Sequence, residues 1–77
     1  PRRTALARLS RKVPSHPGVT HFVRVSLRRE GDELYADPIT ASGAGVLSSI
    51  TRADGVVVVP PELEGYEAGE RVWVYLM

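Results

Sequence analysis

The most regular hydrophobic alternation in the chain lies in residues 20–37, THFVRVSLRREGDELYAD. Over residues 20–29, Val23, Val25 and Leu27 fall on one face of an extended segment, and Phe22, Arg24 and other side chains fall on the opposite face. Glu30-Gly31-Asp32 predicts a hairpin turn, after which residues 33–37 return as a short strand. This hairpin predicts a fold built on β-strands.

Two segments nearer the C-terminus are also expected to be strands. Val56–Val59 is apolar on both faces, as is typical of a central strand. In residues 70–77, Val72 and Val74 share one face and Trp73 and Tyr75 share the other. The prolines of the intervening Pro60-Pro61 cannot donate to a ladder, so residues 60–65 are predicted to be a rigid connection.

The secondary structure of the N-terminal segment is less clearly indicated by the sequence. Residues 4–13 predict a strand with Leu6 and Val13 as anchors, although Ala, Leu and Arg also favour a helix. With short strands separated by Gly- and Pro-containing turns, the sequence predicts an all-β, barrel-like domain of five or six strands.

Size and composition narrow the class of protein. The 77 residues suffice for one small domain over residues 1–77, and the absence of Cys excludes disulfides and a zinc ribbon. There is no apolar stretch long enough for a membrane span and no secretory pattern, so we expect a cytoplasmic protein. Because the chain begins at Pro1, we expect it to be excised from a larger multidomain protein.

Charge is unevenly distributed along the chain. Residues 1–29 carry eight basic side chains and no acidic one, whereas residues 30–77 carry nine acidic and two basic side chains. One interpretation is that the two halves neutralise each other in the folded domain. The other is a basic patch that meets nucleic acid or a phosphorylated ligand.

A second informative segment is residues 42–55, SGAGVLSSITRADG. Its small residues predict a tight turn and one short helical turn within about residues 40–53, and Asp54-Gly55 supplies the bend that starts the next strand. Such a segment either is a turn that needs only small residues, or presents backbone N–H groups and hydroxyls to an anion.

Arg24 and the two histidines are the other candidate functional residues. Arg24 is either a surface arginine paired with a carboxylate across the sheet or a fixed ligand for an oxyanion. His16 and His21 have no Cys or carboxylate cluster beside them, so no metal site is predicted. No catalytic set of residues is recognisable in the sequence.

Four motifs occur in order along the chain: Phe22-x-Arg24-Val25, Gly43-x-Gly45-x-x-Ser48-Ser49, Ala53-Asp54-Gly55 before Val56–Pro60, and Glu64-Gly65-Tyr66-x-Ala68-Gly69-Glu70-x-Val72-x-Val74. Together they resemble the C-terminal domain (domain IV) of the MoeA/gephyrin family, the molybdopterin molybdenumtransferases. The resemblance covers residues 6–77. It implies a bent β-ribbon, or β-clip, that forms an incomplete barrel.

The resemblance also implies a function. The parent would insert molybdate into adenylylated molybdopterin, with Mg²⁺ bound by other domains and no cofactor bound by this domain alone. This domain would line the cleft, supply an anion-binding Arg and have no turnover by itself. The implied partners are the other domains of the parent, a second subunit of a homodimer and the small-molecule substrate.

By this resemblance, the residues expected to bind molybdate or phosphate are Arg24, Ser42, Gly43, Ala44 and Gly45, with Ser48 and Ser49 in support. The family commonly has Ser directly after the first Gly of this loop, where this chain has Ala44. Either Ser42 or the backbone N–H groups of Gly43 to Gly45 would then take the place of that hydroxyl.

Two other functions stay open. One is a protein- or peptide-binding scaffold module, because the equivalent region of gephyrin helps to hold receptor tails. Trp73 and Tyr75, on one strand face, fit packing against a neighbouring domain. The other is a small nucleic-acid-binding barrel, which is weakened because Phe22 is the single aromatic residue in the basic half of the chain.

Overall fold

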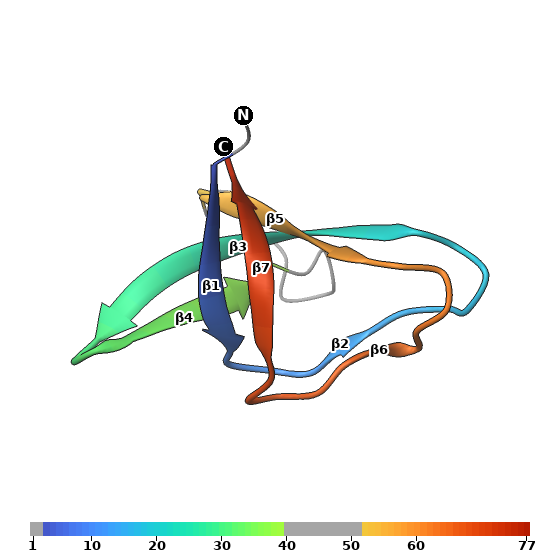
Figure 1. The fold of residues 1–77 in the computed structure, drawn as a ribbon, viewed down its shortest axis with the longest axis horizontal. Helices are drawn as coiled ribbons and strands as arrows, with labels where there is room; N and C mark the ends of the chain where they lie inside the picture. Colours follow the sequence, from blue (N-terminus) through green and yellow to red (C-terminus); the bar gives the residue numbers. More distant parts are fainter. Residues whose placement is uncertain (1–2, 40–51) are drawn as a thin grey trace.

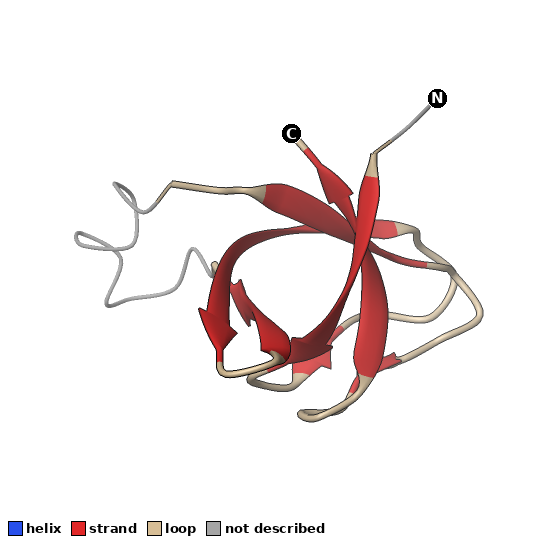
Figure 2. Ribbon diagram, turned by 60° about the vertical axis from the view of Figure 1, so that its left-hand side comes forward, coloured by secondary structure: helices blue, strands red, loops and turns tan. Residues whose placement is uncertain are grey.

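The computed structural model describes residues 3–39 and 52–77, and these residues form an all-β fold. The strands are β1 (Thr4–Leu9), β2 (Val13–Pro14), β3 (His21–Glu30), β4 (Glu33–Pro38), β5 (Gly55–Val59), β6 (Gly65–Tyr66) and β7 (Arg71–Leu76). Five of them form a closed barrel in the order β1-β4-β3-β5-β7, and β2 pairs with β6 in a separate sheet. Figure 1 shows this small sheet to one side of the barrel, and Figure 2 shows the long strands curving around its interior. The all-β, barrel-like fold class predicted from the sequence is confirmed.

The predicted hairpin is formed by β3 and β4. The two strands are antiparallel, with a register that runs from Val25 opposite Pro38 to Glu30 opposite Glu33. The connecting loop is Gly31 and Asp32, and Gly31 has a φ of 59°. A positive φ at the first position of a two-residue loop is typical of a type II′ turn, which glycine adopts without steric cost.

Strand β1 closes the barrel. It is antiparallel to β7 along its length and parallel to β4 at its end, where Leu9 lies opposite Ala36. The backbone nitrogen of Leu76 donates to the carbonyl oxygen of Arg3 at 2.9 Å, so the start of β1 lies beside the end of β7 (Figure 1). The barrel therefore depends on contacts between segments that are distant in sequence.

Small aliphatic side chains fill the core. The buried hydrophobic residues among those described are Ala7, Leu9, Val13, Val23, Val25, Ala36, Val57, Val59, Val72 and Val74. They alternate along each barrel strand, as expected when one face of a strand points inward. No polar or charged side chain in the described ranges is buried, so the interior is held by apolar packing.

The N-terminal segment differs from its prediction in two ways. Leu6 was expected to anchor it, but its side chain is 43% exposed, because the inward positions of β1 are Ala7 and Leu9. The segment is also two strands rather than one, because β1 ends at Leu9 and β2 begins at Val13. Val13 is buried as predicted, and the alternative of a helix is wrong.

The short strand β6 begins at Gly65, the last residue of the region predicted to be a rigid connection, and ends at Tyr66. β6 pairs with β2, with Gly65 opposite Pro14 and Tyr66 opposite Val13. Gly65 has a φ of 124°, and a Cβ atom there would lie 2.0 Å from the carbonyl oxygen of Val13. The close approach of the two backbones therefore requires glycine at this position.

Candidate site at Arg24

Arg24 lies near the middle of β3 with its side chain exposed. Its neighbour on β5 is Val56, and on the other side its carbonyl oxygen accepts a hydrogen bond of 2.9 Å from the backbone nitrogen of Ile39. Both neighbours are apolar, so there is no carboxylate directly opposite. Within the part of the chain that the structure describes, the Arg24 guanidinium has no ion pair and no side-chain hydrogen bond.

Arg28, four residues further along β3, behaves differently. Its Nε donates to Oδ2 of Asp37 at 2.8 Å, its Nη1 donates to Glu30, and its guanidinium carbon lies 4.9 Å from the centre of the Tyr35 ring. The hydrogen bond to Asp37 raises the pKa of Arg28. The interpretation as a paired surface arginine therefore describes Arg28, whereas the Arg24 guanidinium has no partner among residues 3–39 and 52–77.

The segment between β4 and β5 leaves and returns beside Arg24. Val25 lies opposite Pro38 of β4 on one side and opposite Gly55 of β5 on the other. Asp54 fixes the return, because its backbone nitrogen donates to the carbonyl oxygen of Val25 at 2.8 Å and its Oδ2 accepts from the backbone nitrogen of Leu27 at 2.7 Å. Asp54 thus acts mainly as a clamp on β3. Strand β5 begins at Gly55, as predicted, but the predicted bend is wrong, because residues 52–54 form no turn or bend.

The remaining predicted site residues lie outside the described residues. These are Ser42, Gly43, Ala44, Gly45, Ser48 and Ser49, together with the predicted helical turn. Their anion-binding role stays a prediction. The structure nevertheless places both flanks of the segment, Ile39 and Asp54, next to Arg24 and Val25.

A surface hollow of about 360 Å³ adjoins Arg24. Its lining residues come from the start of β3, from β2 and from the end of β4: Lys12, Val13, Pro14, His21, Phe22, Val23, Arg24, Pro38 and Ile39. His21 begins β3 near Arg24, as its place in the sequence predicts, but neither Lys12 nor His21 is among the predicted anion ligands. The closeness of His21 to Arg24 in the sequence could have indicated that both belong to the site. No local pattern indicated that Lys12, twelve residues before Arg24, lines the same hollow.

Some basic side chains of residues 1–29 form ion pairs with acidic residues of the C-terminal half. Nε of Arg8 lies 3.6 Å from Oε1 of Glu33, and Nζ of Lys12 lies 3.9 Å from Oε2 of Glu67. Glu33 Oε1 also lies 3.6 Å from Nη2 of Arg71, which belongs to the C-terminal half itself. The first interpretation of the uneven charge therefore holds for Arg8, Lys12 and Arg28. It does not hold for Arg24.

The described ranges give no sign of a metal centre or a membrane span. Residues 3–39 and 52–77 contain no group of three or more His, Cys, Asp or Glu side chains that could hold a metal ion. The same ranges contain no helix that could cross a membrane.

These features define a small β-barrel domain in which Arg24, beside the connection from β4 to β5, forms no ion pair with the residues that the structure describes. The sequence model of the MoeA C-terminal region (domain IV) matches residues 6–77. The chain therefore belongs to the MoeA family, of which it is a C-terminal domain. The resemblance inferred from the four sequence motifs is confirmed.

Related proteins agree with this assignment. The chain is 41% identical over 69 residues to a molybdopterin biosynthesis protein of Methanocaldococcus jannaschii, and 29% identical over 73 residues to the molybdopterin molybdenumtransferase of Bacillus subtilis. These alignments cover 90% and 95% of this chain, but only 16% and 17% of the two relatives. The chain thus spans about a sixth of their length.

Solved structures show the same fold. The MoeA protein of Pyrococcus horikoshii superposes with a TM-score of 0.78 at 30% identity, over 99% of this chain and 19% of that one. A molybdenum cofactor biosynthesis protein of Pyrococcus furiosus superposes with a TM-score of 0.75 at 40% identity, over 97% of this chain and 26% of that one.

Proposed function

We propose that this chain is the C-terminal domain of a cytoplasmic enzyme that inserts molybdate into adenylylated molybdopterin, and that Arg24 binds the oxyanion in the cleft that the domain lines. The observation that carries the proposal is the guanidinium of Arg24, which has no partner among the described residues and whose strand position lies beside both flanks of the connection from β4 to β5. The names of the relatives support the molybdenum-cofactor context.

The chemistry of the side chain suits this role. A guanidinium stays protonated at all physiological pH values and offers paired N–H donors to a planar or tetrahedral oxyanion. Arg24 would therefore hold and orient molybdate or a phosphate group without taking part in proton transfer. Ser42, Gly43, Ala44 and Gly45 would complete the cradle with backbone N–H groups and a hydroxyl.

The domain is expected to depend on the rest of such an enzyme. We assign Mg²⁺ to other domains of the parent; the described residues contain no group of three or more His, Cys, Asp or Glu side chains that could hold a metal ion. Binding and orientation of one anion do not constitute turnover, so the isolated domain should be inactive.

An exposed apolar face supports contacts with other domains and with a second subunit. Leu6 of β1 lies directly opposite Trp73 of β7 on the outside of the barrel, where their side chains are 43% and 59% exposed. Tyr75, two residues along β7, is 37% exposed on the same face. Exposed aromatic side chains of this kind are typical of protein interfaces.

The same face favours the second candidate function, a protein-binding scaffold without chemistry. The two candidates differ in what Arg24 does, because a scaffold would not need an unpaired arginine beside the connection from β4 to β5. They can be separated by testing whether the complete protein retains metal-binding acidic residues in its other domains.

The direct test is a titration of this chain with molybdate at constant ionic strength, followed by the backbone amide signals of Ile39 and Val56, which flank Arg24. We expect saturable changes in these chemical shifts. The affinity for molybdate should fall about tenfold in an Arg24→Ala variant, because a charge-assisted pair of hydrogen bonds is lost. Arg29→Ala, an exposed arginine on the same strand, is the matched control. Equal affinity in the two variants would refute the assigned role.

A further inference from the structure

The hollow beside Arg24 is lined by segments that are not paired with each other. Its β2 side is formed by residues 12–14, and its β3–β4 side is formed by residues 21–24, 38 and 39. In the described part of the chain, β2 forms a ladder with β6 and none with β3 or β4. The spacing between the two sides of the hollow is therefore set by other contacts.

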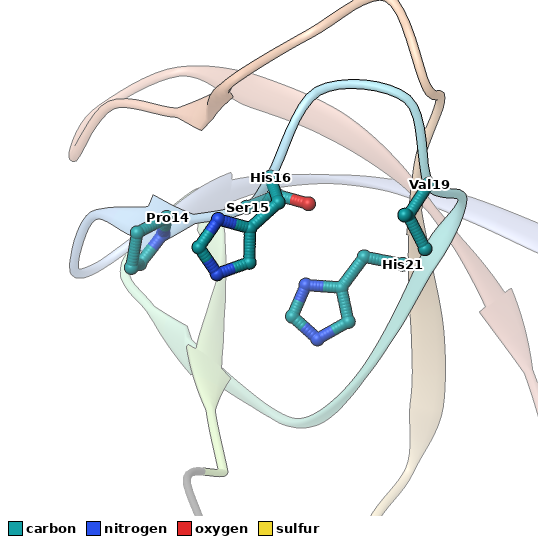
Figure 3. Close-up of a pocket in the computed structure, with 5 residues that line it drawn as sticks. All are labelled: Pro14, Ser15, His16, Val19 and His21. Atoms are coloured by element: carbon teal, nitrogen blue, oxygen red, sulfur yellow. The ribbon is translucent and has the colours of Figure 1, made fainter.

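A second hollow lies at the connection from β2 to β3. It has a volume of about 310 Å³ and is lined by Pro14, Ser15, His16, Val19 and His21. Figure 3 shows Pro14 of β2 and His21 of β3 on separate sides of this hollow. The backbone nitrogen of Ser15 donates to the carbonyl oxygen of Glu64 at 2.9 Å, so the β2 side is held here from the chain before β6 and not from β3.

Arg11 joins the two sides of the hollow beside Arg24. Its Nη2 donates a partly buried hydrogen bond to the carbonyl oxygen of Pro38. Arg11 directly precedes the β2 side, and Pro38 lies on the β3–β4 side. Because a hydrogen bond from a charged donor is stronger than one between neutral groups, this contact suits a tie between segments that form no ladder.

The contacts around this bond agree with its position. The backbone nitrogen of Ser10, just before Arg11, donates to the carbonyl oxygen of Ala36 at 3.1 Å. Burial acts to raise the pKa of Asp37, but hydrogen bonds to its carboxylate lower the pKa, and the charge of Arg11 adds to their effect. The connection from β1 to β2 thus meets the end of β4 at three successive residues, Ala36, Asp37 and Pro38.

The end of β4 is in turn fixed to the strand that carries Arg24. Pro38 lies opposite Val25 of β3, and the backbone nitrogen of Ile39 donates to the carbonyl oxygen of Arg24 at 2.9 Å. The β3–β4 side therefore keeps its shape through backbone contacts. What the bond from Arg11 sets is the position of the β2 side relative to Arg24.

We propose that Arg11 is a positioning residue for anion binding, which holds Pro38 and thereby keeps the β2 side of the hollow at the spacing that admits an oxyanion at Arg24. The inference deepens the proposed function and rests on it, because it takes the oxyanion at Arg24 from there. Arg11 is not among the residues that line the hollow, so it acts through Pro38 rather than as a ligand. Without this bond, the β2 side should move relative to Arg24 while β4 stays paired with β3.

The test is the molybdate titration of this chain, repeated with Arg11→Ala, Arg11→Lys and the control Arg8→Ala. Nη1 of Arg8 donates to the carbonyl oxygen of Gly69 at 2.7 Å, and Arg8 does not line the hollow. Arg8→Ala therefore removes the same charge and the same kind of hydrogen bond elsewhere. Each titration is run at an ionic strength of about 0.05 M and of about 0.2 M, to vary the screening of exposed charges.

We expect Arg11→Ala to bind molybdate about threefold more weakly than the wild type, as the loss of one hydrogen bond allows. Arg11→Lys should keep most of the affinity, because an ammonium group also donates to a carbonyl oxygen, and Arg8→Ala should match the wild type. The ratio between the wild type and Arg11→Ala should persist at the higher ionic strength, because salt screens attraction between charges but does not change the spacing of the hollow.

A second measurement needs no ligand. Hydrogen exchange of the Ser10 amide, which donates to Ala36, should be about threefold faster in Arg11→Ala than in the wild type. Exchange of the Leu76 amide, which donates to Arg3 at the opposite end of β1, should be unchanged.

The inference is wrong if Arg11→Ala binds molybdate as the wild type does, if Arg8→Ala loses as much affinity, or if Ser10 exchange is unchanged. A ratio that disappears at the higher ionic strength would also overturn it, because Arg11 would then attract the anion by its charge alone. If the wild type does not bind molybdate, or if Arg24→Ala binds as tightly, the proposed function fails and the inference falls with it. A loss of affinity in Arg24→Ala without one in Arg11→Ala refutes the inference alone.

Discussion

The backbone nitrogen of Ile39 donates a hydrogen bond of 2.9 Å to the carbonyl oxygen of Arg24. This bond ties the exit of β4 to the middle of β3, at the residue whose side chain we propose as the anion ligand. On the other side of β3, Arg24 lies opposite Val56. The guanidinium is therefore displayed from a strand that is paired on both edges, so its backbone position is fixed before any ligand arrives.

Asp54 should matter for the stability of this arrangement. An Asp54→Ala variant removes the acceptor for the Leu27 backbone nitrogen, which now lies 2.7 Å from Oδ2. We expect a loss of about 1 kcal/mol in the free energy of unfolding, measured by urea denaturation. Asp54→Asn keeps an acceptor oxygen and should retain most of the stability. Equal stability of the Ala variant and the wild type would show that the clamp contributes nothing.

Gly65 should be intolerant of any side chain. A Cβ atom at this position would lie 2.0 Å from the carbonyl oxygen of Val13, and φ is 124°. We expect Gly65→Ala to separate β2 from β6 and to lower the free energy of unfolding, measured by thermal denaturation, by more than about 1 kcal/mol. Gly18→Ala is the control, since Gly18 also has a positive φ, of 92°, but has open space around its Cβ position. A larger loss at Gly18 than at Gly65 would contradict the steric explanation.

Asp37 should make the free energy of unfolding of the domain fall with pH in the acidic range. Partial burial acts to raise the pKa of its carboxyl, but hydrogen bonds from Ser10 and Arg28 and the charge of Arg28 outweigh burial and hold the pKa below its ordinary value of 3.8. A carboxyl whose pKa is lower in the folded state stabilises the fold above the unfolded pKa, and this contribution is lost as pH falls through the folded pKa.

The corresponding measurement is urea denaturation of the wild type and of Asp37→Asn across the acidic range. We expect the stability of the wild type to exceed that of the variant at neutral pH, and the gap to narrow as pH falls below 3.8. A gap that widened on acidification would mean that the pKa of Asp37 is raised in the folded state.

Trp73 should contribute little to the stability of the isolated domain. Its side chain is 59% exposed, and Trp73→Thr should change the free energy of unfolding of this chain by less than about 1 kcal/mol. The neighbouring Val74 is fully buried, so Val74→Ala should lower the free energy of unfolding by about 2 kcal/mol.

Because the chain has a single Trp, acrylamide quenching of its fluorescence reports on the exposure of Trp73 directly. We expect strong quenching in the isolated chain and protection in a complete MoeA-type protein, and equal quenching in both would argue against docking at Trp73.

Local patterns in the sequence predicted most of the barrel. The alternation of Val23 and Val25, the hairpin glycine Gly31 and the alternation of Val72 and Val74 each report a single strand or turn, and the structure confirms all of them. Such signals are readable because they depend on neighbours one or two residues away.

Features that depend on distant partners were not predicted. The sequence predicts Leu6 as an anchor, yet the register of β1 against β7 places it on the outside, opposite Trp73. The parallel pairing of Leu9 with Ala36 that closes the barrel leaves no local trace in the sequence. Lys12 lines the same hollow as Arg24, although it lies twelve residues earlier in the sequence.

The resemblance to a known family supplied what the local patterns could not. From composition and spacing alone, Arg24 was one exposed strand arginine among several, and a paired surface role was the simpler interpretation. The structure distinguishes it from Arg28, which has carboxylate partners at Asp37 and Glu30. The anion-binding role of the segment that includes Ser42 and Gly45 stays a prediction.

The central claim is that Arg24 binds the oxyanion, and the most direct measurement is the molybdate requirement of a complete MoeA-type enzyme that carries this domain. Molybdenum-cofactor yield is measured over a series of molybdate concentrations for the wild type, Arg24→Ala and the control Arg29→Ala. We predict that Arg24→Ala needs about tenfold more molybdate for half-maximal yield, while Arg29→Ala matches the wild type. An unchanged molybdate requirement in Arg24→Ala would contradict the claim.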